Sequence, residues 1–376
     1  MKATFTLEDH QFMARAIHLA EQGRYTTSPN PRVGCVLVKH GEIVGEGFHL
    51  KAGQGHAEVN AIAMAGEKSR GATAYVTLEP CSHVGRTPPC ANALIKAGVD
   101  TVVVAMVDPN PQVSGQGLTM LSQAGIEIKS GLLAEDAQRL NIGFIKRMTT
   151  GLPFIRCKLA SSLDGKTAMA SGESQWITST DARQDVQRLR AQSCAIISGA
   201  DSVFVDNARM NVRWSELGDL KNSYLEAEVR QPMRLIIDTK NRLTPDLALF
   251  SVQSKVIIVR TSIENSHQWP HFVEEVILPK AVKSEYVDLT AVLKLLADKG
   301  CNEVLIESGM SLSGAFIEQD LVDELVLYQA AKLMGNEGYG LVKMPMIDKL
   351  SQAKKLSFAE VTIIGDDLKI IGQFKE

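Results

Sequence analysis

The chain has 376 residues, of which 45% are hydrophobic and 22% charged, and its formal net charge is −3. This composition excludes a mainly disordered chain, and the apolar runs are far shorter than the roughly 18–20 residues of a membrane span. The slightly acidic balance counts against a general nucleic-acid binder. We therefore expect a two-domain protein that lacks a secretory signal and is located in the cytoplasm.

Helical and strand patterns alternate along the first part of the chain. Apolar residues recur at helical spacing from Phe12 to Ala20, and Gly23 ends this helix. Two β-rich runs meet at His40-Gly41, which indicates a hairpin. The expected elements are helices at residues 7–22, 57–67 and 91–97 and strands at residues 33–39, 42–48, 74–78, 101–107 and 126–129. They imply a mixed sheet covered by helices, and so an α/β domain.

The polar stretch 141–151 is the best candidate for a domain boundary, and we place the boundary after residue 147. This gives domains 1–147 and 148–376. The second domain is also α/β, with expected strands at residues 154–159, 195–198, 234–238, 255–260, 303–307 and 324–330 and helices at residues 181–190 and 290–299. A long polar connection at residues 206–231 is either a functional loop or simply mobile.

The six cysteines do not have the density of a disulfide framework. We expect four of them to be small buried side chains, which is the commonest role of a cysteine outside a disulfide. Cys81 and Cys90 differ, because His56 and Glu58 precede them at the start of a predicted helix. One imidazole and two thiolates are the three protein ligands that a catalytic zinc site needs, with a fourth position left for water.

These four residues predict a catalytic zinc site. Zinc lowers the pKa of its bound water to about 7, and Glu58, two residues from His56, is close enough to carry the proton of that water. The alternative is that His56 is a surface histidine and that Cys81 and Cys90 are buried cysteines unrelated to it. This alternative is the more common explanation for any one of these residues, but it does not explain why all of them occur together in this order. H-x-E followed by P-C-x-x-C is the signature of zinc nucleobase deaminases, but here eight residues instead of two separate Cys81 from Cys90. This longer loop points away from cytidine and polynucleotide deaminases.

Three segments of the first domain stand out: TLEPCSHVGRTPPC at 77–90, SPNPRVG at 28–34 and HAE at 56–58. Together they resemble the deaminase half of the bifunctional deaminase/reductase family of riboflavin biosynthesis. The resemblance implies a cytidine-deaminase-like fold in which His56, Cys81 and Cys90 bind one zinc ion and Glu58 shuttles protons. The implied substrate is a diaminopyrimidinone that carries a ribosylamino 5′-phosphate and loses its ring 2-amino group as ammonia.

Other residues near these motifs could contact the substrate. Asn30 lies in a loop that can hydrogen-bond the edge of a ring, with an Asx turn as the alternative. Four residues of the ligand loop offer donors to a phosphate or a ring, or else are ordinary solvated loop residues: Ser82, His83, Arg86 and Thr87.

The second half has no complete G-x-G-x-x-G motif, because Met120 takes the third glycine position after Gly115-Gln116-Gly117. The turn 307–315 is a better phosphate site, since small residues after a strand let backbone N–H groups approach closely. Taken alone, such a turn is more often structural.

Four segments of the second half resemble the reductase half of the same family: KLASSLDG at 158–165, SGESQWI at 171–177, GADSV at 199–203 and the turn 307–315. The resemblance implies a dihydrofolate-reductase-like fold that uses NADPH to reduce the ribosyl group of the deaminated product to ribityl. The residues it implies at the cofactor are Ala160, Trp176, Ser202, Asp206, Gly309, Met310, Ser311, Leu312, Ser313, Gly314 and Ala315. Those it implies at the sugar phosphate are Ser174, Arg190, Met210, Arg213 and Glu307.

Some of these residues carry an argument of their own. The guanidinium forks of Arg190 and Arg213 suit a phosphate, although either arginine alone would more often form a surface ion pair. After Asp206 the family usually has a second aspartate and a proline, whereas this chain has Asn207 and Ala208, so we expect a more flexible loop there.

The sequence thus predicts a bifunctional enzyme, with zinc-dependent deamination followed by NADPH-dependent reduction. Three alternatives remain: a monofunctional zinc deaminase with a non-catalytic second domain, a nucleic-acid-editing deaminase, and a protein whose zinc is purely structural. The acidic charge counts against the second, and a glutamate that is not a ligand counts against the third. We expect small phosphorylated pyrimidines as partners and neither nucleic acid nor a membrane. The resemblance implies a homodimer or larger homo-oligomer joined through the reductase domain.

Overall fold

The computed structural model describes residues 4–83, 88–111, 113–264, 267–345 and 347–375. The chain forms two compact units that divide between Leu152 and Pro153. The boundary predicted at residue 147 lies inside helix α6 (Ile142–Thr150). The start of this helix is tied to the first unit, because the Asn141 amide exchanges two hydrogen bonds of 2.8 Å with the backbone of Arg32. In the described parts of the chain, no helix has both the length and the apolar content of a membrane span.

The first unit is built on a five-stranded mixed sheet with the order β2-β1-β3-β4-β5. Its strands are β1 (Gly34–Lys39), β2 (Glu42–Phe48), β3 (Thr73–Val76), β4 (Thr101–Val104) and β5 (Glu127–Ser130). Strands β2 and β3 run antiparallel to β1, whereas β4 is parallel to β3 and β5 to β4. The hairpin predicted at His40-Gly41 joins β1 to β2, and both of its residues have positive φ.

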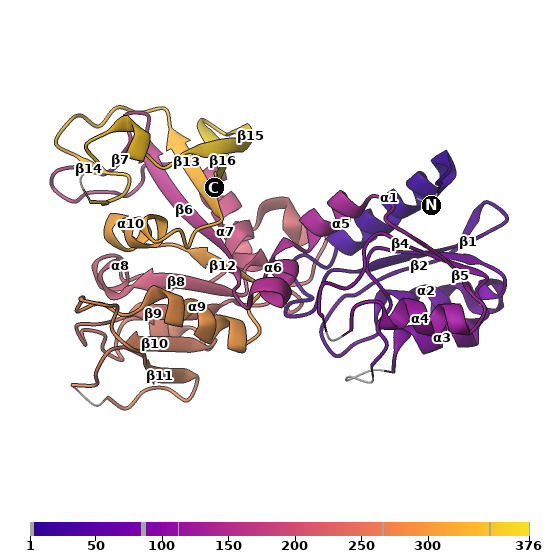
Figure 1. Ribbon diagram of the computed structural model, residues 1–376. Coiled ribbons are helices and arrows are strands. Elements are labelled where there is room, and N and C mark those ends of the chain that lie inside the picture. Colours follow the sequence, from indigo (N-terminus) through magenta and orange to yellow (C-terminus); the bar gives the residue numbers. More distant parts are fainter. Residues whose placement is uncertain (1–3, 84–87, 112, 265–266, 346, 376) are drawn as a thin grey trace. The chain divides into compact units, whose positions relative to one another are not determined.

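Helices cover both faces of this sheet, as Figure 1 shows. They are α1 (Leu7–Glu21), α2 (Ala57–Ala65), α3 (Cys90–Ala97), α4 (Gln116–Gln123) and α5 (Ala134–Leu140). Because side chains alternate along a strand, Cys35 and Leu37 pack with α2, α3 and α4, whereas Val36 and Val38 pack with α1 and α5. The sequence patterns did not predict α4, α5 or α6.

Helix α1 packs closely on the sheet at one glycine. A Cβ atom added to Gly34 would lie 1.9 Å from the carbonyl oxygen of Ala16. Only glycine therefore allows the backbone of β1 to approach α1 at this point. The close contact fixes the start of β1 beside α1.

The second unit contains a nine-stranded sheet with the order β11-β10-β9-β8-β12-β6-β13-β16-β15. Its strands are β6 (Phe154–Ser162), β8 (Ala195–Gly199), β9 (Met233–Ile237), β10 (Val256–Arg260), β11 (Val273–Ile277), β12 (Glu303–Ile306), β13 (Glu324–Ala330), β15 (Leu356–Ile364) and β16 (Asp367–Phe374). The strands from β11 to β13 are parallel, and β16 and β15 add an antiparallel edge. The predicted α/β class is therefore confirmed for both units, although the edge strands β11 and β15 and the inner strand β16 were missed.

The remaining elements of the second unit are α7 (Thr180–Gln192), α8 (Ala200–Asp206), α9 (Leu289–Asp298), α10 (Met310–Glu318) and the short antiparallel pair β7 (Lys166–Ala168) and β14 (Tyr339–Gly340). Ala182, Val186 and Leu189 of α7 share one core with residues of β8, β9, β10, β12 and β13. Parallel strands end at the same edge of a sheet, and loops at that edge commonly form ligand sites. The segments after β8, β9 and β12 accordingly line the cavities described below.

Candidate active sites

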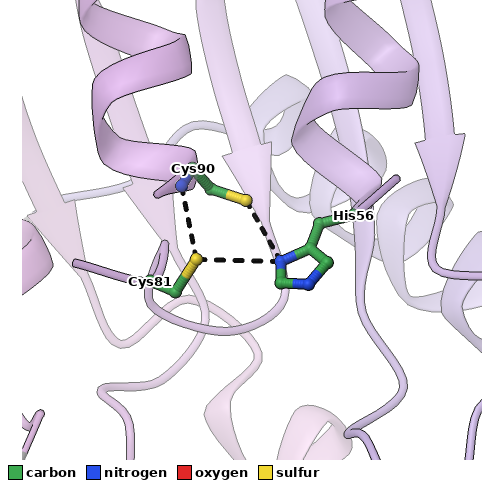
Figure 2. Close-up of side chains that lie close together, drawn as sticks. All are labelled: His56, Cys81 and Cys90. Atoms are coloured by element: carbon green, nitrogen blue, oxygen red, sulfur yellow. Dashed lines mark hydrogen bonds between the residues drawn. The ribbon is translucent and has the colours of Figure 1, made fainter. Parts of the chain in front are cut away.

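Three side chains from separate parts of the first unit converge at one point. His56 caps the start of α2, Cys81 lies in the segment after β3, and Cys90 is the first residue of α3. Figure 2 shows the three side chains pointing toward one another. The Nδ1 atom of His56 lies 3.2 Å from the Cys90 sulfur and 3.7 Å from the Cys81 sulfur. All three ligand atoms lie within 4.8 Å of one another.

The donor atoms fit a tetrahedral zinc ion. Bond lengths of about 2.0 Å to nitrogen and about 2.3 Å to sulfur place the two donor atoms about 3.5 Å apart around such an ion. The observed distances of 3.2 and 3.7 Å between His56 and the two sulfurs bracket this value. The backbone N–H of Cys90 donates to the Cys81 sulfur over 3.3 Å, as expected of a thiolate held at a helix N-terminus.

The two thiol groups and the carboxyl group of Glu58 lie close together here, and this concentration of acidic groups favours a bound cation. Contacts with the Cys90 thiol and the His56 ring lower the pKa of Cys81 to about 4, whereas the neighbouring Cys81 thiolate raises the pKa of Cys90 well above its usual value. Glu58 is only 3% exposed, and burial raises its pKa to about 7. A divalent cation would stabilise both thiolates together, because it supplies the positive charge that the site otherwise lacks.

The candidate metal-binding cluster of His56, Cys81 and Cys90 opens into a cavity of about 490 Å³. Its lining includes Pro29, Asn30, His49, His56, Glu58, Glu79, Cys81, His83, Asp108, Asn110, Val113, Phe144 and Met148. A pocket with a few convergent polar groups and a group of perturbed pKa is typical of an active site. Glu58 therefore lies next to the ligands and also on the wall of a space that can hold a substrate.

His49 determines the orientation of the predicted residue Asn30. Its Nδ1 atom lies 3.1 Å from the carbonyl oxygen of Gly55, so this nitrogen must carry the proton and donate it. Its other nitrogen, Nε2, therefore accepts a hydrogen bond of 3.0 Å from Nδ2 of Asn30. The Oδ1 atom of Asn30 is then the atom that can accept from a substrate amino group.

The structure adds residues that the sequence analysis did not select. His49, Glu79, Asp108 and Asn110 all line the cavity. Of these, Glu79 belongs to the 77–90 motif, and Asp108-Pro109-Asn110 is a loop after a strand, so sequence position was the only available signal. Among the loop residues that we considered, His83 lines the cavity, and Ser82 lies 3.5 Å from the side-chain oxygen of Gln116. Arg86 and Thr87 are outside the described residues.

A cavity of about 720 Å³ lies in the second unit. The predicted residues that line it are Ala160, Ser174, Trp176, Arg190, Ser202, Asp206, Met210, Arg213, Glu307, Gly309 and Met310. Residues far apart in the sequence are thus gathered around one space large enough for a substrate beside part of a cofactor.

Arg190 and Glu307 form a buried ion pair on the wall of this cavity. The guanidinium Nε and Nη2 atoms donate to the two carboxylate oxygens over 2.6 and 2.8 Å, and Nη1 donates to the carbonyl of Asn211 over 3.0 Å. Burial alone would raise the pKa of Glu307, but the charge of Arg190 holds it below its usual value. Lys158 lines the same wall, and burial lowers the pKa of its ammonium group.

The two arginines predicted to bind phosphate differ in their surroundings. The side chains of Arg190 and Glu307 are only 12% and 9% exposed. Arg213 forms a bidentate pair with Glu216 at 2.6 and 2.7 Å, but both of these side chains are 38% exposed. Arg213 can therefore reach a ligand from solvent more easily than Arg190.

The departure from the family pattern at Asn207 has a structural counterpart. Asn207 ends α8 with a left-handed φ of 43°, and its side-chain oxygen accepts a hydrogen bond of 2.8 Å from the backbone of Ala248. Asparagine tolerates this conformation better than most residues. The expected flexibility of this loop is thus opposed by a specific contact.

A second cavity of about 680 Å³ adjoins the first through Ser202, Ser308, Gly309 and Met310. Its lining includes Ser311, Leu312 and Ala315 of the predicted turn, together with Thr239, Lys240 and Arg242, which the sequence analysis did not select. Ser313 and Gly314, which were also predicted to contact the cofactor, are not among the residues that line either cavity. The Ser313 hydroxyl is buried 2.9 Å from that of Ser308, and a Cβ atom on Gly314 would lie 2.1 Å from the carbonyl oxygen of Lys343.

Known families match both units. Residues 153–370 match the RibD C-terminal domain, and residues 7–106 match the cytidine and deoxycytidylate deaminase zinc-binding region. The riboflavin biosynthesis protein RibD of Escherichia coli (strain K12) is 50% identical over 363 residues, which are 96% of this chain and 98% of that protein. A solved structure of Acinetobacter baumannii RibD is 42% identical, with a TM-score of 0.90 over 98% of this chain and 99% of that chain.

A further solved structure, from Thermotoga maritima, is that of a diaminohydroxyphosphoribosylaminopyrimidine deaminase/5-amino-6-(5-phosphoribosylamino)uracil reductase. It is 34% identical to this chain, and the TM-score is 0.84. The match covers 98% of this chain and 99% of the Thermotoga maritima chain. The similarity to these proteins thus extends through both units.

Proposed function

The chain belongs to the RibD family, and from this membership we infer that it is a bifunctional enzyme of riboflavin biosynthesis. The first reaction is the hydrolytic deamination of a diaminopyrimidinone that carries a ribosylamino 5′-phosphate. The second is the reduction of the ribosyl group of the resulting 5-amino-6-(5-phosphoribosylamino)uracil to a ribityl group, with NADPH as reductant. Because matches to both family domains are present, this function is favoured over a monofunctional deaminase with a non-catalytic second domain.

The observation that carries the deaminase proposal is the cluster of His56, Cys81 and Cys90 beside Glu58 on a cavity wall. We propose that the three ligands hold one zinc ion per chain, which when bound acts as a Lewis acid that activates water for attack. Glu58 would accept the proton of that water and deliver it to the departing ring amino group, which leaves as ammonia. A buried carboxyl group beside the ligands, whose pKa is raised by burial, suits both the accepting and the donating step.

The orientation of Asn30 supports a role in substrate binding. With its Nδ2 atom committed to His49, its Oδ1 atom can accept a hydrogen bond from an amino or ring N–H group of the pyrimidine. The hydrogen bond from His49 to Gly55 fixes this arrangement before a substrate arrives. We expect this contact to orient the ring so that its 2-amino carbon faces Glu58.

The two adjoining cavities of the second unit support the reductase proposal. NADPH is an extended molecule, and the two cavities, which share Ser202, Ser308, Gly309 and Met310 in their walls, offer two neighbouring spaces at the ends of β8, β9 and β12. Ala160, Trp176, Ser202, Asp206 and the turn 309–315 are the proposed cofactor contacts, of which Ser313 and Gly314 would act by shaping the turn. Ser174, Arg190, Met210, Arg213 and Glu307 are the proposed contacts of the sugar phosphate.

Within this second set the geometry favours a division of roles. Arg213 is exposed enough to exchange its ion pair for a phosphate. The Arg190–Glu307 pair is buried and presents fixed donors and acceptors to the sugar hydroxyl groups. Because Arg190 already donates three hydrogen bonds within the protein, it is pre-organised rather than mobile.

Two measurements on the purified protein test the proposed function. Zinc content is measured together with ammonia release from the diaminopyrimidinone phosphate, and we expect one zinc ion per chain and steady ammonia production. Oxidation of NADPH in the presence of the deaminated product is followed by absorbance. A lack of ammonia release would contradict the deaminase proposal, and a constant absorbance would leave only the monofunctional alternative.

We further propose a cytoplasmic location and a homo-oligomer joined through the reductase unit. A reducing compartment keeps the paired thiols of Cys81 and Cys90 available for metal binding. The acidic net charge favours small phosphorylated pyrimidines over nucleic acid as partners. Sedimentation at several protein concentrations tests the oligomer, and the absence of salt-sensitive binding to tRNA or single-stranded DNA tests the exclusion of nucleic acid.

A further inference from the structure

Glu79 has an unusual set of partners for a side chain on the wall of the deaminase cavity. It is 5% exposed and accepts four hydrogen bonds, all from backbone N–H groups. Asp108 and Gly115 donate to Oε2 over 3.0 and 2.9 Å. Gly117 and Leu118 donate to Oε1 over 2.9 and 3.4 Å.

These four donors mark the two ends of one loop. Asp108 lies just after β4, and Gly115 is the N-cap of helix α4, to which Gly117 and Leu118 belong. Gly115 has no side chain to cap this helix, so the carboxylate of Glu79 takes the place of the cap and also favours the positive end of the helix dipole. The same carboxylate therefore caps α4 and closes the loop that precedes it.

A second contact holds the same helix in place. A Cβ atom added to Gly117 would lie 1.9 Å from the carbonyl oxygen of Pro80. The backbone of α4 thus packs directly on the residue between Glu79 and the proposed ligand Cys81. Hydrogen bonding and close packing both fix the position of the loop relative to the metal-binding cluster.

The loop that Glu79 closes lines the cavity in front of that cluster. Asp108, Asn110 and Val113 all belong to the cavity wall. The backbone N–H of Asn110 donates to the Asp108 carboxylate over 2.8 Å, so these two polar residues form a single ordered turn. Displacement of the loop ends would therefore change the shape and the polar groups of the cavity without removing a zinc ligand.

We propose that Glu79 is a positioning residue for deamination, which acts by holding Asp108 and Asn110 at the cavity where the pyrimidine binds. This inference rests on the proposed deaminase function. It assigns Glu79 no contact with the reacting atoms and no part in proton transfer. Its effect is on substrate binding, through the loop.

The test uses Glu79→Gln in the full chain, with the zinc-loaded enzyme. The glutamine side chain has nearly the same volume, but its NH₂ group would face two backbone N–H donors. We expect the KM for deamination to rise at least tenfold, which corresponds to about 1.4 kcal/mol, with kcat within threefold of the parent and zinc content unchanged. Amide hydrogen exchange of Asp108, Gly115, Gly117 and Leu118 should be faster. Glu79→Asp keeps the charge and should have an intermediate KM.

Two further variants make the test specific. Gly117→Ala pushes α4 away from Pro80 while leaving the carboxylate in place, and it should also raise KM. Thr119→Val removes an exposed hydroxyl whose hydrogen bond to the Gly115 carbonyl does not involve Glu79, and it should leave KM unchanged. NADPH-dependent reduction by the second unit of the same molecules is the control for enzyme concentration, and unchanged zinc content is the control for folding of the deaminase unit.

An unchanged KM in Glu79→Gln, or a loss of zinc together with activity, would overturn the proposal. The first result would mean that the loop does not depend on the carboxylate, and the second that Glu79 supports the ligands instead. Failure of the parent enzyme itself to deaminate the pyrimidine would contradict the proposed function, which is a separate outcome.

Discussion

Arg190 and Arg213 provide a matched pair for testing how burial decides the role of an ion pair. Each arginine makes a bidentate contact with a glutamate in the reductase unit, and both line the same cavity. The side chains of the Arg190–Glu307 pair are 12% and 9% exposed, whereas those of the Arg213–Glu216 pair are both 38% exposed. Replacement of each arginine by methionine removes the charge but keeps much of the apolar side chain.

The expected losses differ severalfold. Arg190→Met leaves the buried carboxyl group of Glu307 without its main partner, and loss of one partner of a buried pair costs about 3–5 kcal/mol. The ammonium group of Lys158 stays on the same wall and partly compensates, so we expect the lower end, about 3 kcal/mol. Arg213→Met breaks a partly exposed pair, which is worth about 0.2–1 kcal/mol. For a unit of this size, 3 kcal/mol corresponds to a fall of roughly 6–12 °C in Tm.

Differential scanning calorimetry measures both variants in the full chain. NADPH stabilises the unit that binds it, so the transition that NADPH moves upward identifies the reductase unit. In enzyme assays, Arg213→Met should raise the KM for the sugar phosphate at nearly unchanged Tm. Equal Tm values for the two variants, or a larger fall for Arg213→Met, would refute the argument from burial.

Three further predictions concern the deaminase unit. Glu58→Gln should lower the kcat of deamination at least 100-fold, as loss of an acid–base group does, while zinc content stays at the parent level; full turnover in this variant would contradict the assigned role. Removal of the metal with a chelator should abolish ammonia release but leave NADPH oxidation unchanged, and added zinc should restore ammonia release. An undiminished rate of ammonia release after verified zinc removal would exclude metal-dependent deamination. Gly34→Ala should destabilise the unit by about 2 kcal/mol or more, because the new methyl group meets the Ala16 carbonyl; urea denaturation measures this change, and a neutral result would show that α1 can move aside freely.

The proposed chemistry of the deaminase site could be predicted from the sequence because its signals are local. His56 and Glu58 are two residues apart at the start of a helix. Cys81 follows a strand that the sequence predicts, and Cys90 begins a helix that the sequence predicts. Metal ligands are few chemical types with restricted geometry, so their identities and order carry most of the information. The length of the loop between the two cysteines then separated this chain from other zinc deaminases.

The residues of the second site could be predicted only from the resemblance to a known family. They are spread from Ala160 to Ala315, and no single sequence motif contains them. The parallel sheet brings the segments after β8, β9 and β12 to one edge. The pairing of Arg190 with Glu307 depends on this arrangement, since 117 residues separate them in the chain. Sequence patterns could name both residues but could not show that each is the partner of the other.

The composition, the α/β alternation and the identity of the proposed zinc ligands thus follow from the sequence itself, since each depends on residue type and short spacing. Tertiary structure alone decided which way Asn30 is oriented, which residues of the turn 309–315 face a cavity, and that Glu79 holds a distant loop. The physical reason is that a side-chain hydrogen bond to backbone N–H groups leaves no trace in the residue types of its donors. The four donors to Glu79 are an aspartate, two glycines and a leucine, and only the folded chain brings them to one carboxylate.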